Sequence, residues 1–117
     1  MNKIYHLSTC NTCQRIIDEL GKEKFQLQDI KKENIDAQTL DAFKEKVGSY
    51  EALFSKRAMK FRSMGLNKME LSENDYRRWM LEEYTFLKRP FIIIGDKVFV
   101  GNSKKVVAEA KAELDAQ

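Results

Sequence analysis

The chain has 117 residues, of which 33% are charged, and a formal net charge of +3. A chain of this length buries somewhat less than about 70% of its unfolded surface, which is enough for one hydrophobic core without disulfide bonds. The charge is too small to indicate nucleic-acid binding, and we expect none. We find neither a secretory signal nor an apolar run near about 18 residues, so we expect a cytoplasmic protein without membrane contact.

The N-terminal third has the pattern of a strand, a helix and a second strand. The segment Lys3–Leu7 is short and mostly apolar. The segment Gln14–Leu20 carries isoleucine and leucine at helical spacing and is followed by Gly21, a plausible C-cap. Residues Phe25–Ile30 then alternate between apolar and polar side chains, which is typical of a strand. This order predicts a right-handed βαβ unit with parallel strands.

The strand pattern disappears over residues 36–87, approximately. Apolar spacing there predicts helical segments over 40–47, 50–54 and 72–87. Ser72 is the expected N-cap of the last helix, and Asp75 is a weaker capping-box partner than glutamate. We interpret this stretch as a helical insertion within a single domain of residues 1–117.

The C-terminal part predicts a hairpin and a closing helix. Residues Phe91–Ile94 and Val98–Val100 flank a Gly95-Asp96 turn, as in an antiparallel hairpin, and Ser103–Leu114 has helical spacing. The complete order is βαβ, helical insertion and ββα. It predicts an α/β protein with a thioredoxin-like fold and a mixed central sheet.

Two cysteines, Cys10 and Cys13, form a Cys-x-x-Cys motif where the first strand gives way to the helix. Free N–H groups and the helix dipole at such a place lower a cysteine pKa from about 8.5 to roughly 3.5 to 7.5. Cys10 is therefore the expected nucleophile. Cys13 lies one turn further along the same helix face and can resolve an intermediate as a disulfide. The motif predicts thiol redox chemistry.

A metal site is not expected, because structural zinc needs four ligands and the chain offers two cysteines and one histidine, His6. Half of a zinc site shared between two copies and purely structural cysteines remain as alternatives, although we expect a monomer. In a reducing compartment a Cys-x-x-Cys motif is mostly a dithiol, so its oxidation would be catalytic or regulatory.

Four motifs together resemble one known family. They are Ile4-Tyr5-His6 before the cysteine motif, Ser55-Lys56-Arg57, Lys88-Arg89-Pro90 before three isoleucines, and Val100-Gly101 before the last helix. Over nearly its whole length the chain resembles the ArsC/Spx family, with features of both its arsenate reductase branch and its Spx/YffB branch. The resemblance implies a thioredoxin-like sheet in which Pro90, the only proline, follows a cis peptide bond.

The resemblance to the arsenate reductases implies an enzyme. In those reductases a histidine stands four residues before the nucleophile, as His6 does before Cys10, so the resemblance implies that His6 is catalytic. The alternative is a strand histidine with no role beyond packing or solvent contact. They also hold the oxyanion with three arginines, whose forked donors suit tetrahedral oxyanions. Arg89 matches one of them. Arg57 instead matches the arginine of the Spx/YffB branch, two positions beyond the reductase position. Both are candidate oxyanion-binding residues.

The third reductase arginine has no counterpart, because Asn102-Ser103 stand where the reductases carry Arg-Pro. Lys104 or Lys105 is a candidate substitute that offers a point charge without the forked geometry.

Cys13 favours a different branch. Spx-type regulators use a Cys-x-x-Cys disulfide as a switch and bind the RNA polymerase α subunit, whereas YffB-like proteins are glutathione-dependent thiol reductases. For an enzyme we expect no bound cofactor, and glutathione, glutaredoxin or thioredoxin as electron donor. The basic stretch Lys56–Arg62 faces an acidic partner, an oxyanion or solvent, and we favour solvent.

Overall fold

The computed structural model describes residues 2–117, which divide into two compact units. The sheet unit contains the residues up to Glu33 together with Arg89–Gln117, and the helical unit is Asn34–Lys88. The helical unit spans the insertion expected from the sequence, and the prediction of one domain over the whole chain stays a prediction. Among residues 2–117, no helix is long and apolar enough to cross a bilayer.

The sheet unit has four strands: β1 (Asn2–His6), β2 (Gln26–Asp29), β3 (Phe91–Ile94) and β4 (Lys97–Val100). Their order across the sheet is β2-β1-β3-β4. Strand β1 pairs in parallel with β2, while β3 pairs antiparallel with both β1 and β4. The predicted βαβ unit, the hairpin and the mixed sheet are confirmed.

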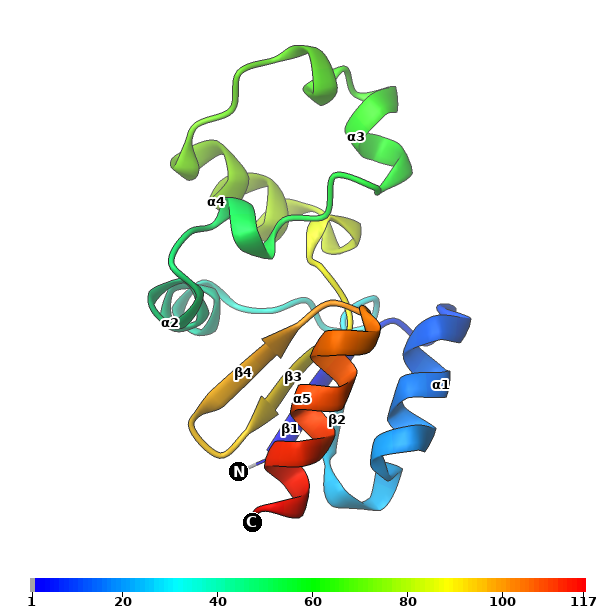
Figure 1. The fold of residues 1–117 in the computed structure, drawn as a ribbon. Coiled ribbons are helices and arrows are strands. Elements are labelled where there is room, and N and C mark those ends of the chain that lie inside the picture. The colour runs from blue at the N-terminus through cyan, green and yellow to red at the C-terminus, as the bar shows by residue number, and fades with distance from the viewer. Residues whose placement is uncertain (1) are drawn as a thin grey trace. The chain divides into compact units, whose positions relative to one another are not determined.

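Helices α1 (Asn11–Leu20) and α5 (Lys104–Asp115) cover one face of this sheet (Figure 1). Successive side chains of a strand point to opposite faces, so Ile4 lies in one row with its cross-strand partners Leu27 and Ile92. This row packs against aliphatic side chains of both helices, namely Ile16, Ile17, Leu20, Val107 and Ala110. The core thereby fixes where α1 begins relative to the end of β1.

The helical unit contains α2 (Ala37–Val47), α3 (Met59–Ser63) and α4 (Glu73–Glu82). Its centre is the ring of Phe54, which contacts the rings of Phe61, Tyr76 and Phe86 at centroid distances of 5.7, 5.0 and 4.9 Å. Polar side chains add to this cluster. Arg77 Nε donates to Asp41 Oδ1 at 2.8 Å, and the Tyr50 hydroxyl donates to the same oxygen at 2.6 Å.

The start of α4 confirms the predicted cap. Ser72 Oγ accepts from the N–H of Asp75 at 3.2 Å, and Asp75 Oδ2 accepts from the N–H of Ser72 at 2.9 Å. The predicted end of this helix at Leu87 is wrong, because α4 ends at Glu82. Glu83 is extended, with φ −134°, and its carboxylate accepts from the N–H of Thr85 at 3.3 Å, which caps a 3₁₀ turn over Tyr84–Phe86.

Two further segments differ from expectation. The helical segment expected over 50–54 is a 3₁₀ turn at Glu51–Leu53. Phe54, which follows this turn, has an extended backbone. Helix α3 was not expected as a separate element. It is one short helix between Ala58 and Met64, and a 3₁₀ turn at Leu66–Lys68 follows it.

Candidate active site

Cys10 lies between the end of β1 and the start of α1. It is the N-cap residue, with extended backbone angles of φ −93° and ψ 108°, so the helix begins at the next residue. The backbone carbonyl of Leu7 accepts from the N–H of Cys10 at 2.9 Å and from the Gln14 side-chain amide at 3.3 Å. These bonds hold the Cys10 main chain against the end of a strand that belongs to the sheet core.

The pKa of Cys10 is lowered below that of an ordinary thiol. Partial burial of the side chain raises it, but the N–H of Cys13, the thiol of Cys13, the positive charge of Arg89 and the N–H of Thr12 together outweigh burial. Thr12 and Cys13 supply the second and third N–H groups of α1, which have no partner within a helix and therefore stabilise an anion. Cys10 is thus prepared to react as a thiolate.

Cys13 has the opposite character, although it lies in the same helical turn. Its side chain is completely buried. Burial is the main cause that raises its pKa to about 12. The Leu7 backbone, the second-largest effect, lowers the pKa, the hydrogen bond to Cys10 and the charge of Cys10 raise it further, and the charge of Arg89 lowers it slightly. Both cysteines are free thiols in this structure. The site therefore pairs a partly exposed cysteine of lowered pKa with a buried cysteine of raised pKa.

His6 is buried at the end of β1, with 8% of its surface exposed. The Gln14 amide nitrogen lies 3.3 Å from His6 Nδ1, and the same nitrogen donates to the carbonyl of Leu7. A carbonyl only accepts, so the amide orientation is fixed and Nδ1 must be unprotonated. Burial lowers the pKa of His6, against an opposing effect of Asp29. Within residues 2–117, His6 is hydrogen-bonded to Gln14 and not to Cys10, and its catalytic role stays a prediction.

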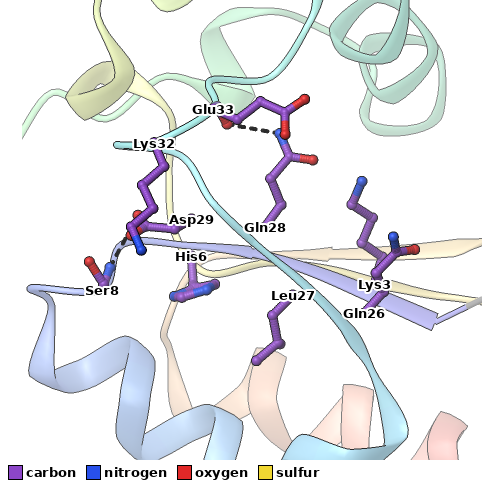
Figure 2. A pocket seen from close by; sticks show the side chains of 9 residues that line it. All are labelled: Lys3, His6, Ser8, Gln26, Leu27, Gln28, Asp29, Lys32 and Glu33. Atoms are coloured by element: carbon purple, nitrogen blue, oxygen red, sulfur yellow. Dashed lines mark hydrogen bonds between the residues drawn. The ribbon is translucent and has the colours of Figure 1, made fainter.

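A hollow of about 460 Å³ lies beside β2 in the sheet unit. Figure 2 shows Asp29 near the backbone of Ser8, whose N–H lies 3.4 Å from Asp29 Oδ1, and Gln28 bound to the carbonyl of Glu33. The lining contains two lysines, Lys3 and Lys32, and two carboxylates, those of Asp29 and Glu33, so its positive and negative charges are balanced. His6 is also part of the lining, but this mixed charge does not match an oxyanion site.

The structure brings Arg89 and the cysteines into one electrostatic group, because the charge of Arg89 lowers the pKa of both sulfurs. The Arg89–Pro90 peptide bond is cis, as the resemblance implies. Arg57 lies in the helical unit, in a turn before α3, with an exposed side chain. Its role in the site stays a prediction.

In this chain, the position of the missing third arginine lies at the start of α5. Ser103 is the N-cap of α5, and its hydroxyl accepts from the N–H of Val106 at 3.1 Å. Lys104 and Lys105 are exposed in the first turn of that helix. The residues that replace Arg-Pro therefore start a helix.

The sequence model of the ArsC family matches residues 5–110. The chain belongs to the ArsC family. No curated protein sequence matches it significantly.

Solved structures share the fold of this ArsC-family chain. A protein named YFFB gives a TM-score of 0.78 at 24% identity and covers 94% of this chain and 98% of its own. An arsenate reductase from Vibrio cholerae gives 0.78 at 17% identity, with 93% and 96% covered. An arsenate reductase (ArsC) related protein from Brucella melitensis gives 0.70 at 27% identity, with 89% and 88% covered. The thioredoxin-like α/β fold is thereby confirmed.

Sequence analysis missed two residues next to the predicted site. Gln14 links His6 to the Leu7 carbonyl, and Asp29 acts on the pKa of His6 from β2. Gln14 follows Cys13 directly, but a glutamine in a first helical turn has no distinctive spacing. Asp29 becomes visible only through strand pairing, which places it opposite His6.

Proposed function

We propose that this ArsC-family protein is a thiol oxidoreductase of the arsenate reductase type, with Cys10 as its nucleophile. The observation that carries the proposal is the contrast between two thiols in one helical turn. Cys10 has a lowered pKa beside the charge of Arg89, and Cys13 has a pKa raised to about 12. The family match and the fold shared with the Vibrio cholerae arsenate reductase support the same activity.

The reaction proceeds by exchange at sulfur. The Cys10 thiolate attacks the arsenic of arsenate, an S–As bond forms, and one oxygen takes up protons and leaves as water. A thiolate of the electron donor then attacks the Cys10 sulfur. An S–S bond forms, the S–As bond breaks, and its electron pair stays on arsenic, which leaves as arsenite. A second donor thiol reduces the mixed disulfide and restores Cys10.

Arginine charge favours the first step. The Arg89 guanidinium already stabilises negative charge on Cys10, and a guanidinium offers parallel donors to a tetrahedral oxyanion. Within residues 2–117, the Arg57 side chain makes no hydrogen bond or ion pair, so its donors are available for the same role. We propose both as oxyanion-binding residues, and we propose His6 as a catalytic residue.

An external thiol suits the resolving step better than Cys13. Thiolate, and not thiol, is the attacking species, and the pKa of about 12 leaves Cys13 protonated. With both cysteines free, Cys13 is also completely buried. Glutathione or glutaredoxin, in the cytoplasm, is therefore the proposed electron donor.

The test is NADPH consumption with glutathione reductase, glutathione, glutaredoxin and arsenate. Wild type is expected to turn over, Cys10→Ser to fall to background, and Cys13→Ser to retain most of the rate. Turnover that survives in Cys10→Ser would reject the assigned nucleophile. Wild type without arsenate-dependent turnover would reject arsenate reduction with this donor.

A second candidate function rests on the contact between the two thiols. The Cys13 thiol donates toward the Cys10 sulfur, so a peroxide can convert the pair to a disulfide while it is itself reduced to water. Such a disulfide would act as an Spx-like switch for binding the RNA polymerase α subunit. Binding of purified α subunit that requires peroxide and both cysteines would support the switch.

A YffB-like thiol reductase would instead turn over a glutathione mixed disulfide in the same NADPH assay.

A further inference from the structure

Gln14 makes two contacts with the nitrogen of its side-chain amide. This nitrogen lies 3.3 Å from His6 Nδ1 and 3.3 Å from the backbone carbonyl oxygen of Leu7. An amide nitrogen carries two hydrogens, so it can donate one to each acceptor. Turning the amide over would place its oxygen against two acceptors and break both bonds. The two contacts therefore hold the amide in one orientation.

Gln14 also contacts the main chain on both sides of the proposed nucleophile. Its backbone N–H donates to the carbonyl of Cys10 at 3.2 Å, and the Leu7 carbonyl that binds its side chain accepts from the Cys10 N–H at 2.9 Å. Gln14 thus connects the backbone of Cys10 with the ring of His6. Because His6 is buried and Gln14 is half-buried, breaking their contact would leave polar atoms with little access to water.

This contact decides which nitrogen of His6 carries the proton. A neutral imidazole has one N–H and one acceptor nitrogen. Gln14 occupies Nδ1 as the acceptor, so the proton lies on Nε2. A proton on Nδ1 would face the amide N–H, donor against donor, and Gln14 would have to move away. His6 therefore has a donor to offer at Nε2, and its acceptor is already bound.

The charged side chains near His6 do not take the place of Gln14. Asp29 lies opposite His6 on β2, and its charge raises the pKa of His6. However, its carboxylate accepts from the N–H groups of Ser8 and Lys31. Within residues 2–117, the side chain of His6 is hydrogen-bonded to Gln14 and not to Asp29. The hollow that His6 lines also contains the charged residues Lys3, Lys32 and Glu33 (Figure 2).

We propose that Gln14 is a positioning residue that occupies Nδ1 of His6 and so makes His6 a hydrogen-bond donor and not a base. This role rests on the proposed function, in which His6 takes part. A base must present an unprotonated nitrogen to the proton that it removes, and in His6 that nitrogen is bound to Gln14. A neutral N–H can instead donate to an oxyanion oxygen. The Cys10 thiolate is then stabilised by helix N–H groups and Arg89, without proton transfer to His6.

The experiment is ¹H–¹⁵N NMR of the imidazole in untagged protein at neutral pH. His6 is the only histidine of the chain, so the spectrum contains one imidazole, and its ¹⁵N signals show which nitrogen carries the proton. Wild type is expected to carry it on Nε2 alone. Gln14→Glu replaces the donor by an acceptor. It is expected to place a proton on Nδ1 and to raise the pKa of His6 by about one unit.

Two further variants separate this hydrogen bond from the effect of charge. Gln26→Glu makes the same substitution at an exposed position of β2. It is expected to leave the proton on Nε2 and to shift the pKa of His6 much less than Gln14→Glu does. Asp29→Asn is expected to lower the pKa of His6, because the charge of Asp29 raises it, and also to leave the proton on Nε2.

Two NMR results would overturn the proposal. One is wild type with a proton on Nδ1 at neutral pH, which decides the question even if a variant does not fold. The other is Gln14→Glu with the proton still on Nε2 alone. Both spectra are recorded on resting protein without arsenate, so their failure is distinguishable from failure of the proposed function.

The NADPH assay with arsenate tests the donor role itself. His6→Gln offers an amide donor but no base, whereas His6→Ala offers neither. His6→Gln is therefore expected to keep more of the arsenate-dependent rate than His6→Ala. An equal loss of rate in the two variants would contradict the donor role.

Discussion

The sheet unit and the helical unit are stabilised by different kinds of contact. In the sheet unit, aliphatic residues of β1 and β3 pack against α1 and α5 in one layer. In the helical unit, aromatic rings gather around Phe54, and side-chain bonds such as those of Asp41 link α2 to α4. The first kind of core follows regular strand and helix periods, whereas the second depends on individual contacts.

This difference matters for function. Cys10 lies where a core strand ends, and its backbone N–H donates to the Leu7 carbonyl. A reactive group is positioned more precisely on a rigid element than on a flexible one. The helical unit instead exposes the thioethers of Met59, Met64 and Met69.

The largest effect is expected from the sheet core. Ile92→Ala removes a completely buried side chain from the row that also contains Ile4, and should lower the free energy of unfolding by about 2–5 kcal/mol. The measurement is urea denaturation followed by circular dichroism. Met59→Ala, at a position 89% exposed, is the control and should change stability by less than about 0.5 kcal/mol. Equal losses in the two variants would contradict the assignment of the core.

A smaller effect is expected at the start of α4. Ser72→Ala removes the hydroxyl that accepts from the N–H of Asp75 and leaves the bond from the residue 72 N–H to Asp75 Oδ2, and it should cost about 0.5–2 kcal/mol in urea denaturation. Ser63→Ala, at an exposed position at the end of α3, is the matched control and should be nearly neutral. A neutral Ser72→Ala would show that the helical unit does not depend on this local contact.

The charge of Arg89 is expected to increase the reactivity of Cys10. Because its charge lowers the pKa of Cys10, Arg89→Ala should slow iodoacetamide alkylation of Cys10 at neutral pH severalfold, and Arg89→Lys should restore most of the rate. Peptide mass spectrometry measures both. Lys111→Ala, at an exposed position of α5, is the control for lost positive charge, and equal slowing in that variant would contradict the effect assigned to Arg89.

The smallest effect is expected from the Asp41–Arg77 pair, because its partners are partly exposed to solvent. The hydrogen bond from Arg77, with that from Tyr50, lowers the pKa of Asp41 from 3.8 to about 2. The unfolded chain therefore binds this proton first as pH falls, so the stabilisation is complete above about pH 4 and is lost toward about pH 2. The urea midpoints of wild type and Asp41→Asn should converge over that window, and a constant difference would contradict the pairing.

Regular periods explain which parts of the fold were predictable. The alternation in Phe25–Ile30 and the apolar run Phe91–Ile94 predicted two strands of the sheet, and Ser72 with Asp75 predicted the start of α4. The end of α4 was missed, because it is decided by bonds that the Glu83 carboxylate makes to Thr85 and to Lys60, which is distant in sequence. Such contacts have no period.

The same limit applies to the site. The motif spacing predicted Cys10 at the helix start and Cys13 one turn further along, because backbone geometry alone sets these positions. It did not predict that Cys13 is completely buried and has a raised pKa. The Gln14 bond that fixes the tautomer of His6 was not predictable, because it depends on how a helix packs beside a strand.

The central claim is that Cys10 is the reactive thiolate and Cys13 a buried thiol. Its most direct test is the pH dependence of iodoacetamide alkylation at each cysteine, resolved by peptide mass spectrometry of the native protein. Cys10 is expected to react with a midpoint below that of an ordinary thiol, and Cys13 to react only after denaturation in urea. A Cys10 midpoint at or above that of an ordinary thiol, or faster alkylation of Cys13 in the native protein, would contradict the account.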